Sequence, residues 1–129
     1  MTRSSPFAQL RSLLRRSVPA GCHVSEHKGT QSYYFDDDTA AAAEITVSGG
    51  SGILIAVVRR ADGWRGSFVV DIWSRFAEEV WVVDGENQTI EQVAKQERRT
   101  VRDGEAIESV ALPDLRLPLS EVFGTGERG

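Results

Sequence analysis

Residue types that bind transition metals gather at one point of the sequence, at Cys22, His23, Glu26 and His27. On an extended strand the two histidines would share a face, but about 13 Å would separate them, which is too far to share one ion. A helical turn would bring them closer. We therefore expect surface or loop residues here, and a transition-metal site is the alternative. Cys22 is the only cysteine, so the chain can form neither an internal disulfide nor a four-cysteine zinc site.

Three arginines, Arg11, Arg15 and Arg16, lie close together near the N-terminus. Because guanidinium groups bind phosphates, contact with a nucleic-acid backbone is one hypothesis for them. A solvated helix face is the simpler interpretation. The formal net charge of -4 supports it, since an acidic chain is poorly suited to general polyanion binding.

The composition predicts one globular domain. The chain has 129 residues, 40% of them hydrophobic, which provides for one core and leaves no room for a second comparable one. We expect the domain to span residues 1–123, with a flexible tail over 124–129. The longest strongly apolar run, 53–58, is too short to cross a bilayer, and the N-terminus has no signal-peptide pattern. We therefore predict a cytoplasmic protein without a membrane partner.

Apolar periodicity predicts an α+β fold. Ser5 and Pro6 are typical of a helix start, and Phe7, Leu10 and Leu14 then recur at helical spacing, so a helix is expected over 6–17. Further helices are expected over 67–78 and 120–123. Turn residues separate runs that are typical of strands. Short strands around a turn near Lys28 are expected over 22–35, an acidic loop follows at 36–38, and further strands are expected over 43–48, 52–59, 80–83, 89–95, 99–102 and 106–110. This order predicts one mixed central sheet flanked by helices.

Large aromatic and acidic residues accompany the central elements. Trp64, Trp73 and Trp81 are expected to fill the core or cover the sheet, because tryptophan contributes a large buried area. One that stayed exposed would mark a dimer or ligand face. Glu79 and Asp84 bracket an apolar strand, and we expect them to make turn and surface contacts.

Three stretches follow the order of motifs in a known family. Glu79–Asp84, EVWVVD, is similar to the signature GV.EYWLVD, and residues 112–123, LPDLRLPLSEVF, are similar to the closing motif LPGL.L.L.ELF. The opening helix with Leu13, Leu14 and the sequence VPAG is similar to the motif L..AL...LP.G. With these motifs the chain resembles the Uma-two family of restriction-endonuclease-like proteins over nearly its whole length.

The resemblance implies the nuclease fold of the PD-(D/E)xK superfamily. In such sites two acidic residues on adjacent strands hold a divalent cation, and a nearby lysine orients or activates the attacking water. The family's first acid aligns with Glu44, and its second aligns with Ala56, where no carboxylate remains. Its lysine aligns near Phe68 or Val69, which are apolar.

Lysines are scarce throughout the chain. Only two of the 15 basic residues, Lys28 and Lys95, are lysines, and neither lies where the family lysine is expected. The resemblance therefore implies a nuclease fold with a degenerate site that needs no cofactor and acts as a binding or assembly module, as a homodimer or beside a partner protein.

The alternative is an active nuclease that hydrolyses DNA phosphodiesters. It would hold magnesium or manganese with Glu44 and Asp71, and Arg65 would replace the missing lysine as the basic group. The sequence leaves both hypotheses open.

Overall fold

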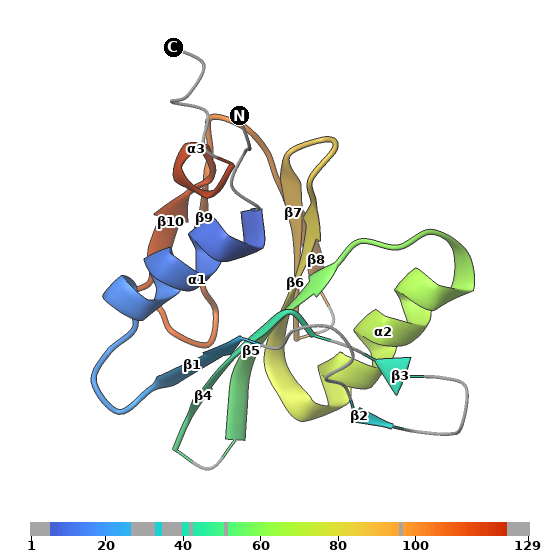
Figure 1. The fold of residues 1–129 in the computed structure, drawn as a ribbon, viewed down its shortest axis with the longest axis horizontal. Helices are drawn as coiled ribbons and strands as arrows, with labels where there is room; N and C mark the ends of the chain where they lie inside the picture. Colours follow the sequence, from blue (N-terminus) through green and yellow to red (C-terminus); the bar gives the residue numbers. More distant parts are fainter. Residues whose placement is uncertain are drawn as a thin grey trace.

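The computed structural model describes residues 6–26, 33–34, 40–41, 43–50, 52–95 and 97–123. A six-stranded sheet with the order β1-β4-β5-β6-β7-β8 forms its centre (Figure 1). Its strands are β1 (His23–Glu26), β4 (Ile45–Gly49), β5 (Gly52–Arg59), β6 (Ala77–Asp84), β7 (Thr89–Ala94) and β8 (Glu97–Val101). Two short pairs accompany it: β2 (Tyr33–Tyr34) with β3 (Ala40–Ala41), and β9 (Ala106–Glu108) with β10 (Arg116–Pro118). The mixed sheet with flanking helices confirms the predicted fold class.

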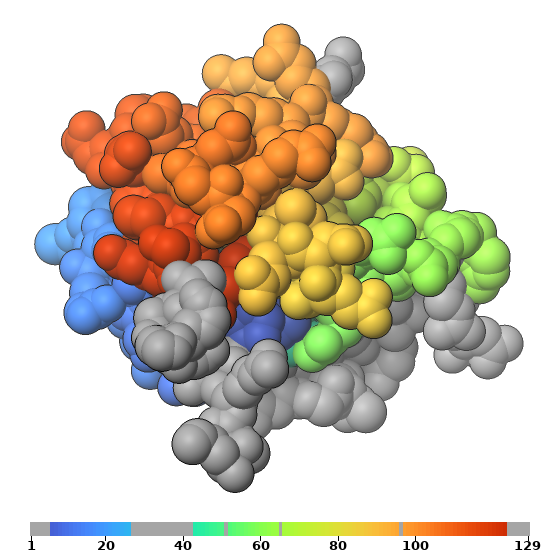
Figure 2. Space-filling model, turned by 90° about the horizontal axis from the view of Figure 1, so that it is seen from above, coloured from blue at the N-terminus to red at the C-terminus, as the bar shows by residue number. Residues whose placement is uncertain are grey.

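The two faces of the sheet are covered by different parts of the chain. Helix α2 (Gly63–Phe76) connects β5 to β6, which pair in parallel, and lies on one face. Helix α1 (Pro6–Ser17), helix α3 (Leu119–Val122) and the β9–β10 pair lie on the other face (Figure 1). Figure 2 shows the orange and red C-terminal segments together, beside the yellow segment around the β6–β7 turn. Because neighbouring strand residues point to opposite faces, each central strand contributes to two apolar cores.

Alternation along β5 shows how the two cores form. Ile55 and Val57 are fully buried on the side of α1 and the C-terminal elements. Ala56 and Val58 are buried on the side of α2. A strand that is covered on both faces has a continuous apolar sequence, and residues 53–58 show this pattern.

Helix α2 differs from its predicted extent. It begins at Gly63, four residues before the expected start, and ends at Phe76, two residues before the expected end. Trp64 therefore lies in the first turn of the helix, nine residues before Trp73, and helical geometry puts the two side chains about 180° apart. Trp73 is buried, whereas 64% of Trp64 is exposed, so the expectation that all three tryptophans are core or sheet-cover residues is wrong for Trp64. Phe76, the last residue of α2, is also exposed.

Strands β3 and β10 were not among the predicted elements. The structure adds β3 at Ala40–Ala41, where it pairs with β2, and β10 at Arg116–Pro118, where it pairs with β9. The predicted helix and strands elsewhere agree with the structure to within a few residues. The turn expected near Lys28 and the acidic run at 36–38 lie outside the described residues, as does the expected tail over 124–129. None of the described helices is long and apolar enough to span a membrane.

Gly66 allows the start of α2 to approach the segment that leads into it. A Cβ atom added at this position would lie 2.1 Å from the carbonyl oxygen of Ala61. This contact is between backbone and Cβ, so no side-chain rotation can relieve it.

We predict that Gly66→Ala destabilises the protein. Alanine normally stabilises a helix relative to glycine by about 1 kcal/mol, but here the clash with Ala61 should reverse the sign and lower the free energy of unfolding by about 2 kcal/mol. Urea unfolding measures this difference. The control is Ser67→Ala at the exposed neighbouring position, which should be neutral or slightly stabilising. A stabilised Gly66→Ala protein would contradict the close approach.

Candidate functional site

The position of the family's second acid is closed to solvent. Ala56 is fully buried in the apolar cluster between the sheet and α2, where Val80 and Trp73 are also buried. Ala43, next to Glu44, belongs to the same cluster and is 4% exposed. A divalent cation requires oxygen ligands, preferably carboxylates, and water. Ala56 lies opposite the buried hydroxyl residue Thr46, and the cluster around it contains no carboxylate among the described residues.

Glu44, the predicted first acid, lies just before β4 at the carboxyl end of β5. Its backbone N–H donates to the carbonyl oxygen of Val57 at 2.8 Å. Its half-buried carboxylate accepts a 3.4 Å contact from Nε of Arg59. The Arg59 guanidinium also lies over the ring of Phe7, 4.7 Å from the ring centroid. Glu44 is therefore part of a charge pair with an arginine.

The other predicted catalytic residues lie in α2. Asp71 is exposed, between Val70 and Ile72, which are buried against the sheet. Arg65 lies in the first turns of the same helix. Among the described residues, no three histidine, cysteine, aspartate or glutamate side chains form a group that could hold a metal ion. The roles of Glu44, Asp71 and Arg65 stay predictions.

The structure separates the residues of the N-terminal metal-type cluster. Glu26 forms an ion pair with Arg11 of α1, His23 is exposed on β1, and Cys22 is half-buried. His27 lies outside the described residues.

The predicted nucleic-acid-binding arginines differ from one another in their surroundings. Arg11 is half-buried and bound to Glu26, which fastens α1 to β1. Arg15 and Arg16 are exposed in the last turn of the helix. Phosphate contact by these three side chains stays a prediction, with Arg15 and Arg16 the more accessible pair.

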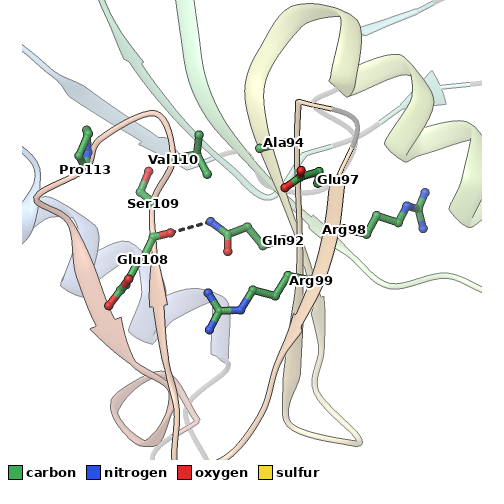
Figure 3. A pocket seen from close by; sticks show the side chains of 9 residues that line it. All are labelled: Gln92, Ala94, Glu97, Arg98, Arg99, Glu108, Ser109, Val110 and Pro113. Carbon is green, nitrogen blue, oxygen red and sulfur yellow. Dashed lines mark hydrogen bonds between the residues drawn. The ribbon is translucent and has the colours of Figure 1, made fainter.

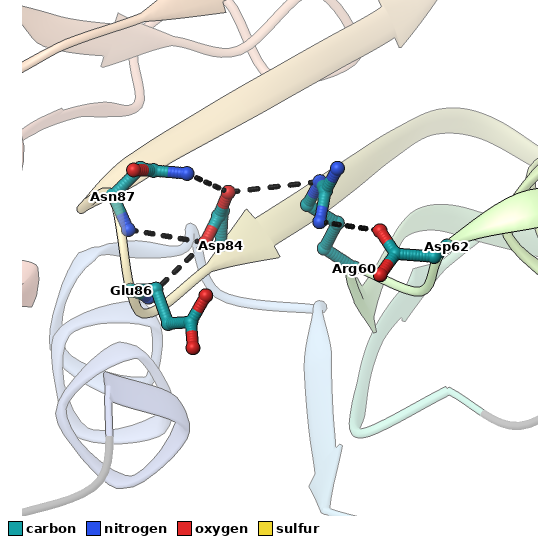
Figure 4. Close-up of polar contacts among 5 residues, drawn as sticks. All are labelled: Arg60, Asp62, Asp84, Glu86 and Asn87. Atoms are coloured by element: carbon teal, nitrogen blue, oxygen red, sulfur yellow. Dashed lines mark hydrogen bonds and ion pairs between the residues drawn. The ribbon is translucent and has the colours of Figure 1, made fainter.

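A charged pocket of about 430 Å³ lies at the carboxyl ends of the parallel strands β5 and β6. Arg60, just after β5, contacts Asp62 at 2.9 Å and Asp84 at 3.6 Å (Figure 4). Asp84 also accepts hydrogen bonds from the Asn87 side chain at 2.8 Å and from the backbone N–H groups of Asn87 and Glu86. Asp84 thus closes the β6–β7 turn, as predicted for a turn residue.

These contacts change the acidity of Asp84. The hydrogen bond from the Asn87 side chain lowers the pKa of the Asp84 carboxyl most, and the backbone N–H of Asn87 lowers it next. Burial opposes them, whereas the backbone N–H of Glu86 and the charge of Arg60 lower the pKa further.

Glu79 is fully buried, which corrects the expectation that it makes turn and surface contacts. Its Oε2 accepts from Nε1 of Trp81 at 2.8 Å and from Nε2 of Gln92. Its Oε1 accepts from Oγ of Ser109 at 2.7 Å and from the backbone N–H groups of Val110 and Ala111, both at 3.1 Å. One carboxylate therefore joins β6, β7 and the segment after β9.

The Glu79 network also explains the motif that carries the family resemblance. The glutamate and tryptophan of the signature correspond to Glu79 and Trp81, which are two residues apart in β6 and so share a face. They bind each other and face the C-terminal elements. Within this chain the signature therefore performs a structural task. Sequence spacing does not reveal this network, because Gln92 and Ser109 lie 13 and 30 residues from Glu79 along the chain.

A second pocket, of about 390 Å³, adjoins this network between the β7–β8 hairpin and the segment after β9. Gln92 and Ser109, both bound to Glu79, form part of its lining (Figure 3). Gln92 also donates to the carbonyl oxygen of Glu108 at 2.7 Å, which bridges the two walls. Arg99 extends into the opening in Figure 3, whereas the Glu108 side chain points away from Arg99, and its Oε2 lies 3.5 Å from Nε of Arg116.

Comparison with solved structures finds a similar fold in a crystal structure from Anabaena variabilis, named as a "putative nuclease belonging to DUF820". The TM-score is 0.66 at 12% sequence identity, and the alignment covers 96% of this chain and 83% of the other. The chain therefore has a nuclease-like fold. No protein-family model matches the sequence. No curated protein matches it either.

We predict a pH-dependent stabilisation from Asp84. Its lowered pKa means that the ionised carboxylate stabilises the folded protein above the pKa of the unfolded chain, about 3.9. This contribution is lost as the pH falls through the folded-state pKa. Wild type should be more stable than Asp84→Asn at about pH 6, and the difference should shrink toward about pH 3. Urea unfolding at several pH values tests this, and a constant difference would contradict it.

We predict that Glu79→Gln destabilises the fold strongly. An amide keeps one acceptor oxygen and turns its NH₂ group toward donors, so buried N–H or O–H groups lose their partner. The free energy of unfolding should fall by about 3 kcal/mol. Chemical unfolding measures this, and the exposed neighbour variant Glu78→Gln should change stability by less than about 0.5 kcal/mol.

Ser109→Ala serves as the milder second variant if Glu79→Gln does not fold. It removes one of the donors to Glu79 and should cost about 1 kcal/mol. Equal stability of Glu79→Gln and Glu78→Gln would show that the Glu79 network contributes nothing.

Proposed function

We propose that this protein is a restriction-endonuclease-like domain of the Uma-two type with a degenerate active site, which acts in the cytoplasm as a binding or assembly module for a protein partner or a second copy. The observation that carries the proposal is the burial of Ala56 beneath α2. A cation held at this position would need both a carboxylate and access to water, and the apolar cluster offers neither.

The surroundings of Glu44 support the same conclusion. Its carboxylate contacts the Arg59 guanidinium, and a cation placed there would have to compete with a positive charge that is covalently fixed nearby. In the family that the chain resembles, a lysine beside two acids orients or activates the attacking water. The residues that align with this lysine, Phe68 and Val69, are apolar and partly buried against the cluster beneath α2. The family motif that this chain retains, around Glu79 and Trp81, supports the scaffold and not the chemistry.

The test is a cleavage assay on the full chain. Plasmid and single-stranded DNA are incubated with the protein and either magnesium or manganese, and we expect no cleavage above that of a Glu44→Ala protein purified in parallel. Asp71→Asn and Arg65→Ala proteins should give the same background, because the proposal assigns these residues no catalytic role.

Cleavage that needs the metal and is lost in both Glu44→Ala and Asp71→Asn would establish the active-nuclease alternative and overturn the degenerate site. Cleavage that persists in every variant would identify a contaminating nuclease in the preparation, and repurification must then remove it before the wild-type result counts. Unfolding curves confirm that each variant is folded.

A further inference from the structure

Strand β8 ends the six-stranded sheet and pairs only with β7 among the described strands. Residues 97–100 are all exposed. Ala94 and Glu97 are partners at the closed end of a two-residue hairpin, in which Lys95 has a positive φ of 53°. In such a hairpin alternate residues exchange backbone hydrogen bonds with the partner strand. Arg98 and Thr100 therefore direct their N–H and C=O groups away from β7, toward the open edge.

The side chains of β8 give this edge a defined chemistry. Arg99 extends over the pocket that Gln92 and Ser109 line, and Arg98 extends on the other side of the strand (Figure 3). Nη1 of Arg98 contacts Oε2 of Glu91 on β7 at 3.1 Å, so this guanidinium is already paired on the face opposite Arg99. A strand added here would thus meet an arginine on each of its faces.

Like charges disfavour one candidate occupant, a second copy of β8. In each antiparallel register of two β8 strands that joins their outward backbone groups, one arginine faces an arginine of the second copy, and like charges directly across a sheet are destabilising. The register that sets Arg98 opposite itself is the least unfavourable, because it also sets Glu97 opposite Arg99. Acidic side chains at the same positions would be stabilised by the same two arginines. The backbone groups of Arg98 and Thr100 would pair with any extended peptide.

We propose that β8 binds an extended, acidic segment of a partner protein by adding it as a seventh strand to the sheet. The backbone groups of Arg98 and Thr100 form the new ladder, and the two arginines select carboxylate side chains. The pocket beside Gln92 receives a side chain of the segment on the face of Arg99. This proposal rests on the proposed binding role, for which it names the partner class and the surface.

The test uses a fluorescent peptide of alternating valine and glutamate, about eight residues long. A valine–lysine peptide of the same length is its control. Anisotropy titration of the full chain should show saturable binding of the glutamate peptide and about tenfold weaker binding of the lysine peptide. Backbone amide resonances of Arg98 and Thr100 should shift on binding, because their N–H groups form the new hydrogen bonds.

Two variants separate the ladder from the charges. Thr100→Pro removes an outward N–H without removing a hydrogen bond to β7, and should weaken binding about tenfold, whereas Thr100→Val keeps the N–H and should bind as wild type does. The double variant Arg98→Glu with Arg99→Glu should prefer the lysine peptide. Unfolding curves show that the variants fold.

Equal binding by the Thr100→Pro and Thr100→Val proteins would overturn the added strand. So would binding of a DNA duplex that competes with the peptide and is insensitive to Thr100→Pro, or self-association that Thr100→Pro abolishes. Failure of the glutamate peptide to bind would refute strand addition at β8, and it would not affect the conclusion about DNA cleavage. DNA cleavage would refute the degenerate site and leave the peptide result standing.

Discussion

The fold depends on one buried charge, the Glu79 carboxylate, which is surrounded by hydrogen-bond donors and contacts no cation among the described residues. An unpaired carboxylate in a protein interior is costly unless donors compensate the loss of water. Here Trp81, Gln92 and Ser109 supply side-chain donors, and the backbone after β9 supplies two more. The segment after β9 therefore lies against this face of the sheet, where its donors compensate the burial of Glu79.

The two faces of the sheet consequently have different characters. On the face of the C-terminal elements a polar network stands within the apolar core and leads to the pocket beside Gln92. On the face of α2 the side chains around Ala56 form a continuous apolar cluster. The family's second acid, in the resemblance, aligns with Ala56 on this second face, where apolar side chains pack in this chain.

Local patterns predicted much of this fold. The first helix has the predicted bounds, and β5 covers the expected range, because capping residues and an apolar run decide these elements within a few residues of sequence. Helix α2 begins earlier than predicted. Its first turn was not predicted because Trp64 is exposed and so does not continue the apolar face that contains Trp73. Strand β10 contains a proline and is paired only through β9, a contact that no local pattern reveals. The burial of Glu79 depends on donors 13 and about 30 residues away, which sequence spacing alone cannot bring together.

The candidate site was less predictable than the fold because it depends on what is missing. The alignment with the family placed Ala56 at the acidic position, but only the structure places that alanine beneath a helix. In an open cleft, a neighbouring carboxylate such as Asp71 could take the place of an absent acid by a change of rotamer. A cluster that is closed by Trp73 and Val70 allows no such replacement without opening the core. In the proposed degenerate site, apolar packing would stabilise the fold at the positions from which water and metal are excluded, and a catalytic site there would require several simultaneous changes.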